Sequence, residues 1–237
     1  FDLLEYSNIN RIIEKNNISE IYNLAAQSFV ASSFKLPIYT SKVNSIGLLY
    51  ILEAVRNINP KMVYLSISGF GQDGPYSRRP ALDIVVQAMG GIMSVTGEPG
   101  KPPLRPGVSI GDSLAGTFAA LSVVTALYQR KIDGIGQYID VSMLDCQLTL
   151  MENALSRYFA SGKTPTPLGS RHPSAAPFQA FKAKDGYFVV GLLTDSNKKW
   201  NIFCDAIDQP ELKDDPLFES NLNRSDNVDA LVLHLSK

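Results

Sequence analysis

Short apolar runs alternate along the chain with longer segments whose apolar residues recur at helical spacing. Strands are predicted at residues 20–25, 63–68, 136–142 and 187–193, and helices at residues 9–16, 38–57, 81–89, 112–130, 143–160, 195–207 and 225–235. Strands that alternate with helices are typical of an α/β fold with a mainly parallel sheet. We therefore predict a mainly parallel, Rossmann-like sheet with flanking helices, followed by part of a small α+β domain.

The predicted helix at residues 112–130 is apolar nearly all round, with no proline and one internal glycine, Gly116. Serine, threonine and glutamine interrupt its uncharged stretch, which therefore falls short of the roughly 20 strongly apolar residues of a bilayer span. We predict a buried core helix. The helix at residues 81–89 is expected to end at Gly90 and Gly91.

Residues 161–177 contain four prolines and two glycines among polar residues, a composition that indicates a linker or mobile loop. His172 lies in this segment, and His234 is the other histidine of the chain. Two separated histidines make no metal-ligand cluster, so we predict a solvated His172 and no metal site. Trp200 is predicted to lie in the core.

Composition narrows the class of protein. The chain has 237 residues, 45% of them hydrophobic, which is enough for a sizeable core. Its 22 basic and 23 acidic residues give a net charge of -1, so there is no electrostatic case for nucleic acid or an anionic membrane as partner. The two cysteines, Cys146 and Cys204, are far apart, and no signal sequence is evident, which favours a cytoplasmic location.

Asp112 follows Gly111 at the start of the predicted long helix, where free amide donors and the positive end of the helix dipole converge. Aspartate at such a position most often caps the helix. It can also act as a carboxylate nucleophile that forms a covalent acyl intermediate. The pattern alone leaves both roles open.

Four colinear stretches carry a family resemblance. They read INPKMVYLSISGFGQDGPYSRRPALD, VVQAMGGIMSVTGEPGKPPLRPGVSIGD, ALYQRKIDGIGQYIDVSMLD and SRHPSAAPFQAFKAKDGYFVV. Together they resemble CoA-transferase family III, which includes formyl-CoA and carnitine CoA-transferases and related racemases. The resemblance implies that Asp112 is the nucleophile and that CoA passes between carboxylic acids through an acyl anhydride and an aspartyl-CoA thioester. It implies acyl-CoA and a carboxylic acid as substrates, no tightly bound cofactor, and a homodimer.

The same resemblance places residues near the CoA site. It implies CoA contacts at Arg78, Arg79, Ala81 and Asp83, and Asp83 also matches an acidic position near the nucleophile. Exposed arginines are more often solvated surface, although a guanidinium can also bind phosphate through two parallel bonds. Asp83 has the alternative role of capping the helix that begins beside it. Many members of this family have a glycine-rich loop near residue 169 that closes over the intermediate, and in this sequence Gly169 is the one glycine left there.

Gly69, Gly71 and Gly74 match the dinucleotide fingerprint G-x-G-x-x-G after a predicted strand. Pro75 follows the third glycine, and no helix opens there to receive a pyrophosphate. We therefore interpret these glycines as a turn that shapes the wall of the active site.

Residues 1–56 differ from the rest. The segment SEIYNLAAQSFVASSFKLPIYTSKVNSIGLLYILEAVR resembles GDP-mannose 4,6-dehydratase. This second resemblance implies contacts with NADP at Leu24, Ala25, Ala26, Gln27 and Ser28. Phe29 stands where that family usually has histidine, the glycine-rich phosphate loop would lie upstream of Phe1, and the sequence has no Tyr-x-x-x-Lys pair. Dehydratase activity is therefore not expected.

The two resemblances meet between residues 56 and 64, which indicates a fusion, either natural or made during assembly. We predict a Rossmann-like dehydratase segment at 1–58, a CoA-transferase large-domain core at 59–165 and a partial small domain at 166–237. The predicted function is CoA transfer, with weak or no activity expected of this chain. The alternatives are an NADP-dependent sugar-nucleotide 4,6-dehydratase fragment and an acyl-CoA racemase or epimerase.

Overall fold

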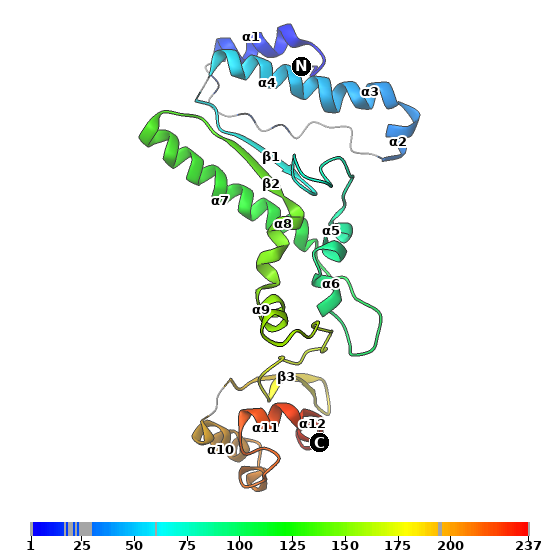
Figure 1. Cartoon of the computed structure of the whole chain (residues 1–237), viewed down its shortest axis with the longest axis vertical. Coiled ribbons are helices and arrows are strands. Elements are labelled where there is room, and N and C mark those ends of the chain that lie inside the picture. The colour runs from blue at the N-terminus through cyan, green and yellow to red at the C-terminus, as the bar shows by residue number, and fades with distance from the viewer. Residues whose placement is uncertain are drawn as a thin grey trace. The chain divides into compact units, whose positions relative to one another are not determined.

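The computed structural model divides into two compact units (Figure 1). The first unit comprises residues 1–90 and 109–150, and the second comprises residues 91–108 and 151–237. The structure describes residues 2–16, 18, 21, 23, 30–59, 61–193 and 196–236. The predicted strand at 20–25 therefore lies largely outside the described residues, and the NADP positions 24–28 lie entirely outside them.

In the first unit, α1 (Tyr6–Asn16) packs on α4 (Gly47–Ile58), as Figure 1 shows. The apolar core between them consists of Ile9, Ile13, Ile51, Ala54 and Val55. The predicted helix at residues 9–16 is confirmed, with a start three residues earlier.

The predicted helix at 38–57 is confirmed but is not uniform. It comprises α3 (Pro37–Ser41), a π-helical turn (Lys42–Ile46) and α4, and it follows the short helix α2 (Val30–Lys35). A π turn places one extra residue in each hydrogen-bonded turn and so shifts the phase of the apolar face. Ile46 and Leu49 are exposed, whereas Ala54 is buried; Leu49 and Ala54 are five residues apart in the regular helix α4 and so lie on different sides of it.

A parallel pair of strands follows. β1 (Tyr64–Ser68) pairs with β2 (Tyr138–Ser142), in a register that runs from Tyr64 opposite Tyr138 to Ser68 opposite Ser142. Between them in sequence are α5 (Asp83–Met89) and α7 (Ile110–Asp133). The α/β alternation is thus confirmed, but the described residues of this unit hold a two-stranded sheet and not the extended Rossmann-like sheet that we predicted.

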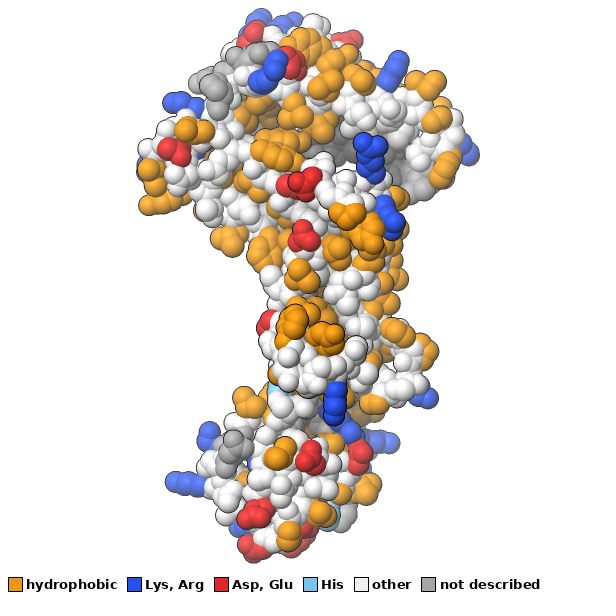
Figure 2. Space-filling view, viewed as in Figure 1, with side chains coloured by type: hydrophobic (Ala, Val, Ile, Leu, Met, Phe, Trp, Pro, Cys, Tyr) orange, Lys and Arg blue, Asp and Glu red, His pale blue; other side chains and the backbone are white. Residues whose placement is uncertain are grey.

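The long helix α7 is buried on one face only. Its small residues Ala115 and Ala119 pack with Val141 of β2, while a stripe of large apolar side chains is exposed. The stripe consists of Leu121, Val124, Tyr128 and Ile132. The prediction of a helix buried all round is therefore wrong, and Figure 2 shows hydrophobic side chains on the surface of this unit. By length and composition α7 could also cross a membrane, contrary to our prediction, although the core helix of a soluble protein meets the same criteria.

The predicted helix at 143–160 is interrupted. It consists of α8 (Met143–Gln147) and a 3₁₀ turn (Leu148–Leu150) in the first unit, and α9 (Glu152–Ser161) in the second. Ser142 begins α8 as its N-cap by accepting a hydrogen bond from the Asp145 amide. The buried side chain of Met151 follows the 3₁₀ turn and precedes α9.

The second unit contains an antiparallel hairpin and several short helices. The hairpin pairs β3 (Phe178–Lys182) with β4 (Tyr187–Gly191), of which only β4 was predicted. The helical elements are α6 (Ile92–Val95), α10 (Asn197–Ala206), a 3₁₀ turn (Pro210–Lys213), α11 (Asn221–Asp226) and α12 (Val228–Leu235). Ser196 is the N-cap residue of α10, and its side chain makes no capping hydrogen bond.

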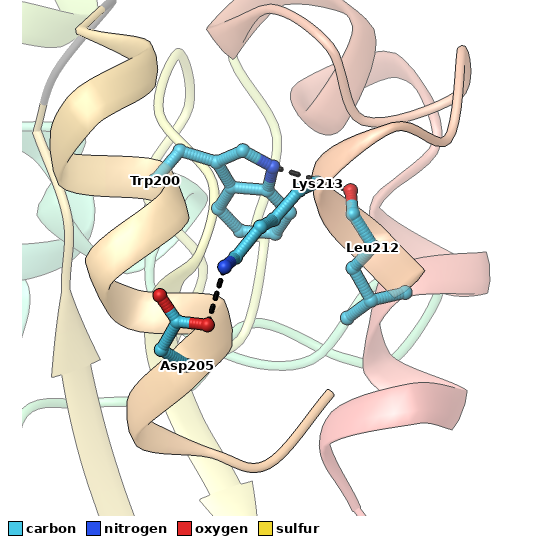
Figure 3. Close-up of polar contacts among 4 residues, drawn as sticks. All are labelled: Trp200, Asp205, Leu212 and Lys213. Atoms are coloured by element: carbon cyan, nitrogen blue, oxygen red, sulfur yellow. Dashed lines mark hydrogen bonds and ion pairs between the residues drawn. The ribbon is translucent and has the colours of Figure 1, made fainter. Parts of the chain in front are cut away.

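The core of the second unit is built around Trp200. The indole Nε1 donates to the Leu212 carbonyl at 3.3 Å, and Lys213 forms an ion pair with Asp205 beside it (Figure 3). The other buried apolar members are Ala176, Phe181, Cys204, Phe218, Leu231 and Leu235. Trp200 is therefore a core residue, as predicted.

The loop that precedes β3 is packed at its C-terminal end. Ala175, Ala176 and Pro177 are buried, and Arg171 bonds to Asp229 at 2.5 Å. The segment has no regular structure, as predicted, but its end is part of the core and not a linker.

The buried thiol of Cys204 gives a pH-dependent prediction. Burial raises its pKa from 9.0 to about 11. Its contribution to stability is therefore complete below about pH 9 and is lost as the pH rises through 11, because the unfolded thiol ionises first. We expect the free energy of unfolding to fall by roughly 2 kcal/mol more between pH 8.5 and 11 in the wild type than in Cys204→Ala. Urea titrations at both pH values measure this difference, and equal falls in the two proteins would contradict it.

Candidate active site

The glycine-rich turn after β1 is held against β2. The Gln72 amide donates to Asp140 Oδ2 at 2.7 Å, and Gly71 has a φ of +83°, which favours glycine. The Cα of Gly69 lies so close to Ala81 that an added Cβ would be 2.1 Å from the Ala81 Cβ. The turn thus places Ala81 next to the end of β1. The next helix, α5, begins at Asp83, so no helix follows Gly74 directly. This agrees with the interpretation of the three glycines as a turn and not as a nucleotide loop.

The two arginines after the turn differ in their contacts. The Arg79 guanidinium lies 4.2 Å from the centre of the Tyr76 ring, a cation–π geometry that holds it in place. Arg78 and Arg79 are both exposed. Two positive side chains are therefore available to an anionic group in solution.

Asp83 does not cap its own helix. The N-cap of α5 is Leu82, and Asp83 is the first helical residue. Its Oδ1 accepts a hydrogen bond from the Gly111 amide at 2.9 Å, and its Oδ2 accepts one from Gln87 Nε2 at 2.6 Å. The alternative of a local cap is thus wrong, because the carboxylate reaches across to the start of α7.

Asp112 is the third residue of α7. The helix begins at Ile110 with Ser109 as its N-cap, so Asp112 is not the capping residue either. Its side chain is exposed, and within the described part of the chain no hydrogen bond or ion pair of its carboxylate is present. The Asp112 carboxylate thus lies in the first turn of a long helix, near the positive end of the helix dipole.

The first turn of α7 lies in a tight junction with α5 and α8. A Cβ on Gly111 would be 2.9 Å from Gln147 Nε2 and from Val86 Cγ2, and a Cβ on Gly90 would be 2.9 Å from Gln147 Oε1. Gln147 is fully buried, and neither polar atom of its amide has a partner among the described residues. Gln87 and Gln147 were not predicted from the sequence, although Asp83 and Gln87 are four residues apart on one predicted helix, a spacing at which side chains meet.

This packing predicts opposite effects for alanine at two glycines of α7. We expect Gly111→Ala to destabilise the first unit by about 1–3 kcal/mol, because the added methyl overpacks a buried junction. Gly116→Ala is the matched control, since an added Cβ there meets no atom within 4 Å. It should stabilise the helix by about 0.5–1 kcal/mol. Urea denaturation followed by circular dichroism tests both, and a neutral or stabilising Gly111→Ala would contradict the junction.

His172 belongs to the second unit and differs from the prediction of a solvated side chain. It is half-buried, its Nδ1 accepts from the Ser174 amide at 3.2 Å, and its ring centre lies 4.8 Å from that of Phe178. In the same unit, the Gly169 amide donates to the Gly97 carbonyl at 2.8 Å. Among the residues that the structure describes, no three His, Cys, Asp or Glu side chains are grouped to hold a metal ion.

Comparison with known families identifies the chain. The sequence model of CoA-transferase family III matches residues 40–237. The chain belongs to this family. This family III CoA-transferase chain is 44% identical over 186 residues to the acetyl-CoA:oxalate CoA-transferase of Acetobacter aceti. The alignment covers 78% of the chain and 47% of that enzyme. It is 37% identical over 195 residues to the mouse succinyl-CoA:glutarate CoA-transferase, and this alignment covers 82% of the chain and 44% of the mouse enzyme.

Solved structures agree with the assignment. A CaiB/BaiF family protein from Brucella suis matches with a TM-score of 0.67 and 37% identity over 78% of the chain and 48% of its own length. A Mycobacterium tuberculosis protein matches the whole chain and 57% of its own length with a TM-score of 0.73 at 23% identity, which shows the fold alone. The CoA-transferase chain spans less than half the length of the curated relatives that it matches.

The sequence model of the GDP-mannose 4,6-dehydratase family also matches the chain, over residues 1–72. It overlaps the CoA-transferase match across residues 40–72 and so includes the predicted junction. The curated relatives above are CoA-transferases, and the dehydratase alternative for the whole chain is not favoured.

Proposed function

We propose that this chain transfers CoA between carboxylic acids with Asp112 as the nucleophile, at the weak turnover expected from its sequence. The observation that carries the proposal is the exposed carboxylate in the first turn of α7, at the position that the family resemblance implies. The names of the relatives pair acetyl-CoA with oxalate and succinyl-CoA with glutarate or citramalate. We therefore infer a short acyl-CoA as donor and a dicarboxylic acid as acceptor.

The reaction balances without an external proton or electron. An Asp112 carboxylate oxygen attacks the thioester carbon of the donor, and the C–S bond breaks. CoA is released as a thiolate, and the acyl group remains on Asp112 as a mixed anhydride. The thiolate then attacks the aspartyl carbon, which releases the donor acid and leaves an aspartyl-CoA thioester. The acceptor carboxylate then attacks the aspartyl carbon of this thioester, which releases CoA thiolate and forms a second mixed anhydride. The thiolate attacks the acceptor carbonyl of that anhydride, so the new acyl-CoA forms and the Asp112 carboxylate is regenerated. Helix N-terminal amides can stabilise the charge that develops on the attacked carbonyl oxygen.

The CoA contacts implied at Arg78, Arg79 and Ala81 remain part of the proposal. Exposed guanidinium groups suit the phosphates of CoA, and the small side chain of Ala81 lets the chain pass close to Gly69. Asp83 was predicted in the same set, but both of its oxygens accept hydrogen bonds from protein donors. We extend the proposal to a homodimer, as the family resemblance implies, and to a cytoplasmic location, as the two separated cysteines favour.

Trapping of the intermediate tests this function. The chain is incubated with acetyl-CoA or succinyl-CoA and oxalate, quenched with hydroxylamine, and digested for mass spectrometry. We expect a hydroxamate on Asp112 that depends on acyl-CoA. The absence of an acyl or CoA adduct on Asp112 would overturn the proposal and would favour the racemase alternative, which needs an acid and base pair but no covalent intermediate.

We also propose that residues 1–58 and 59–237 have separate origins. The two overlapping family matches support this. In the structure, α1 and α4 of the N-terminal segment have their own apolar core, with Met62 packed against it. Sequencing the source DNA across codons 50 to 70 tests how the fusion arose, since an unbroken natural gene there would exclude an assembly product.

A further inference from the structure

The N-terminus of α7 is capped by a different helix. Its N-cap, Ser109, makes no capping bond with its side chain, although the first amides of a helix lack intrahelical acceptors. The Gly111 amide finds its acceptor in Asp83, which is 28 residues earlier and belongs to α5. A charged acceptor at a helix N-terminus also complements the helix dipole.

The acceptor is itself oriented. Gln87, one turn further along α5, donates to the second oxygen of Asp83 at 2.6 Å. The carboxylate is therefore held at both oxygens, with one bond inside α5 and one to α7. The missing side chain of Gly111 allows this approach, because a Cβ there would lie 3.2 Å from Asp83 Oδ1.

The bond acts on the residue next to Asp112. The Gly111 N–H lies in the peptide plane that joins Ile110 to Gly111, so the bond to Asp83 fixes the plane directly before the one that joins Gly111 to Asp112. We propose that Asp83 is a positioning residue that sets the orientation of the Asp112 carboxylate through the Gly111 amide. This inference rests on the proposed function of Asp112. It gives Asp83 a role different from contact with CoA, since a carboxylate beside phosphates would meet charge repulsion.

Three substitutions in the full chain test the proposal. Asp83→Ala removes the acceptor, whereas Asp83→Asn keeps an oxygen for the Gly111 amide while removing the charge. Asp145→Ala is the matched control, because Asp145 is also an acidic residue in the first turn of a helix, α8, and no described hydrogen bond joins its carboxylate to α7. Two measurements are made on each variant: amide exchange in residues 109–114, and the rate of Asp112 acylation by acetyl-CoA trapped with hydroxylamine.

Amide exchange reports on the first turn without any need for catalysis. We expect the Gly111 amide to exchange roughly tenfold faster in Asp83→Ala, and at a near wild-type rate in Asp83→Asn and Asp145→Ala. Unchanged exchange in Asp83→Ala would overturn the proposal. Circular dichroism confirms that each variant is folded.

Acylation reports on the positioning of the nucleophile. We expect Asp83→Ala to acylate Asp112 about tenfold to a hundredfold more slowly, because a small misplacement of a reacting group is costly. Asp83→Asn should stay within about threefold of the wild type. Equal rates in Asp83→Ala and the wild type would overturn the positioning role. Absence of acylation in the wild type would instead refute the proposed function, and amide exchange alone would then decide whether Asp83 orders the turn.

Discussion

Asp112→Asn is expected to reduce covalent labelling by acyl-CoA by at least about a thousandfold, to background. The amide has nearly the shape of the carboxylate but lacks the anionic oxygen that attacks the thioester. Because the side chain is exposed and has no protein partner among the described residues, the substitution should leave the fold unchanged. The readout is acyl or hydroxamate mass on the peptide that contains residue 112, together with exchange of CoA between acetyl-CoA and oxalate.

The control lies at the other end of the same helix. Asp133 is an exposed acidic residue in the last turn of α7, where hydrogen bonds from the Gln129 side chain and the Ile135 amide lower its pKa. Asp133→Asn should label Asp112 at the wild-type rate. Transfer that survives Asp112→Asn while a different carboxylate becomes labelled would show that the nucleophile is elsewhere.

The candidate nucleophile could be predicted because its signal is local. Gly111 and Asp112 lie at the start of an apolar helix, and the family resemblance covers this segment in one stretch. The bond between Asp83 and Gly111 could not be predicted in the same way, because it joins residues on two helices whose packing depends on tertiary structure. The pattern predicted a helix that starts beside Asp83, at about residue 81, but not which amide the Asp83 side chain reaches.

The same limit explains the errors in the fold. Apolar residues all round α7 predicted full burial, but the described chain offers partners only to its small-residue face. The helix predicted at 38–57 contains a π turn at Lys42–Ile46, which helical periodicity alone does not reveal. Strand β3 was missed although Asp185 and Gly186 form a hairpin signal before β4, because the preceding residues do not alternate strictly.

Trp200→Ala is expected to lower the free energy of unfolding of the second unit by about 3–5 kcal/mol, the largest effect on stability that we predict. The side chain is 1% exposed, and it packs against Phe203 and Phe218 with ring centres 5.8 and 6.4 Å away. Its removal leaves a cavity and also deprives the Leu212 carbonyl of its donor (Figure 3).

A second consequence concerns the buried Arg224, whose guanidinium carbon lies 4.7 Å from the centre of the Trp200 ring. Its Nε and Nη1 donate to the carbonyls of Ala176 and Phe218 at 3.0 and 2.8 Å, so the charge stays bound when the indole is removed but loses its aromatic face. Trp200→Phe keeps a ring there and should cost less than the alanine variant.

Urea denaturation followed by far-ultraviolet circular dichroism measures these differences, since the chain has one tryptophan and the variants lose its fluorescence. Leu233→Ala is the control, because Leu233 is a large apolar residue of the same unit that is 74% exposed. It should change stability by no more than about 0.5 kcal/mol. If Trp200→Ala were as stable as Leu233→Ala, Trp200 would not lie at the centre of a packed core, and the order of the second unit would need another source.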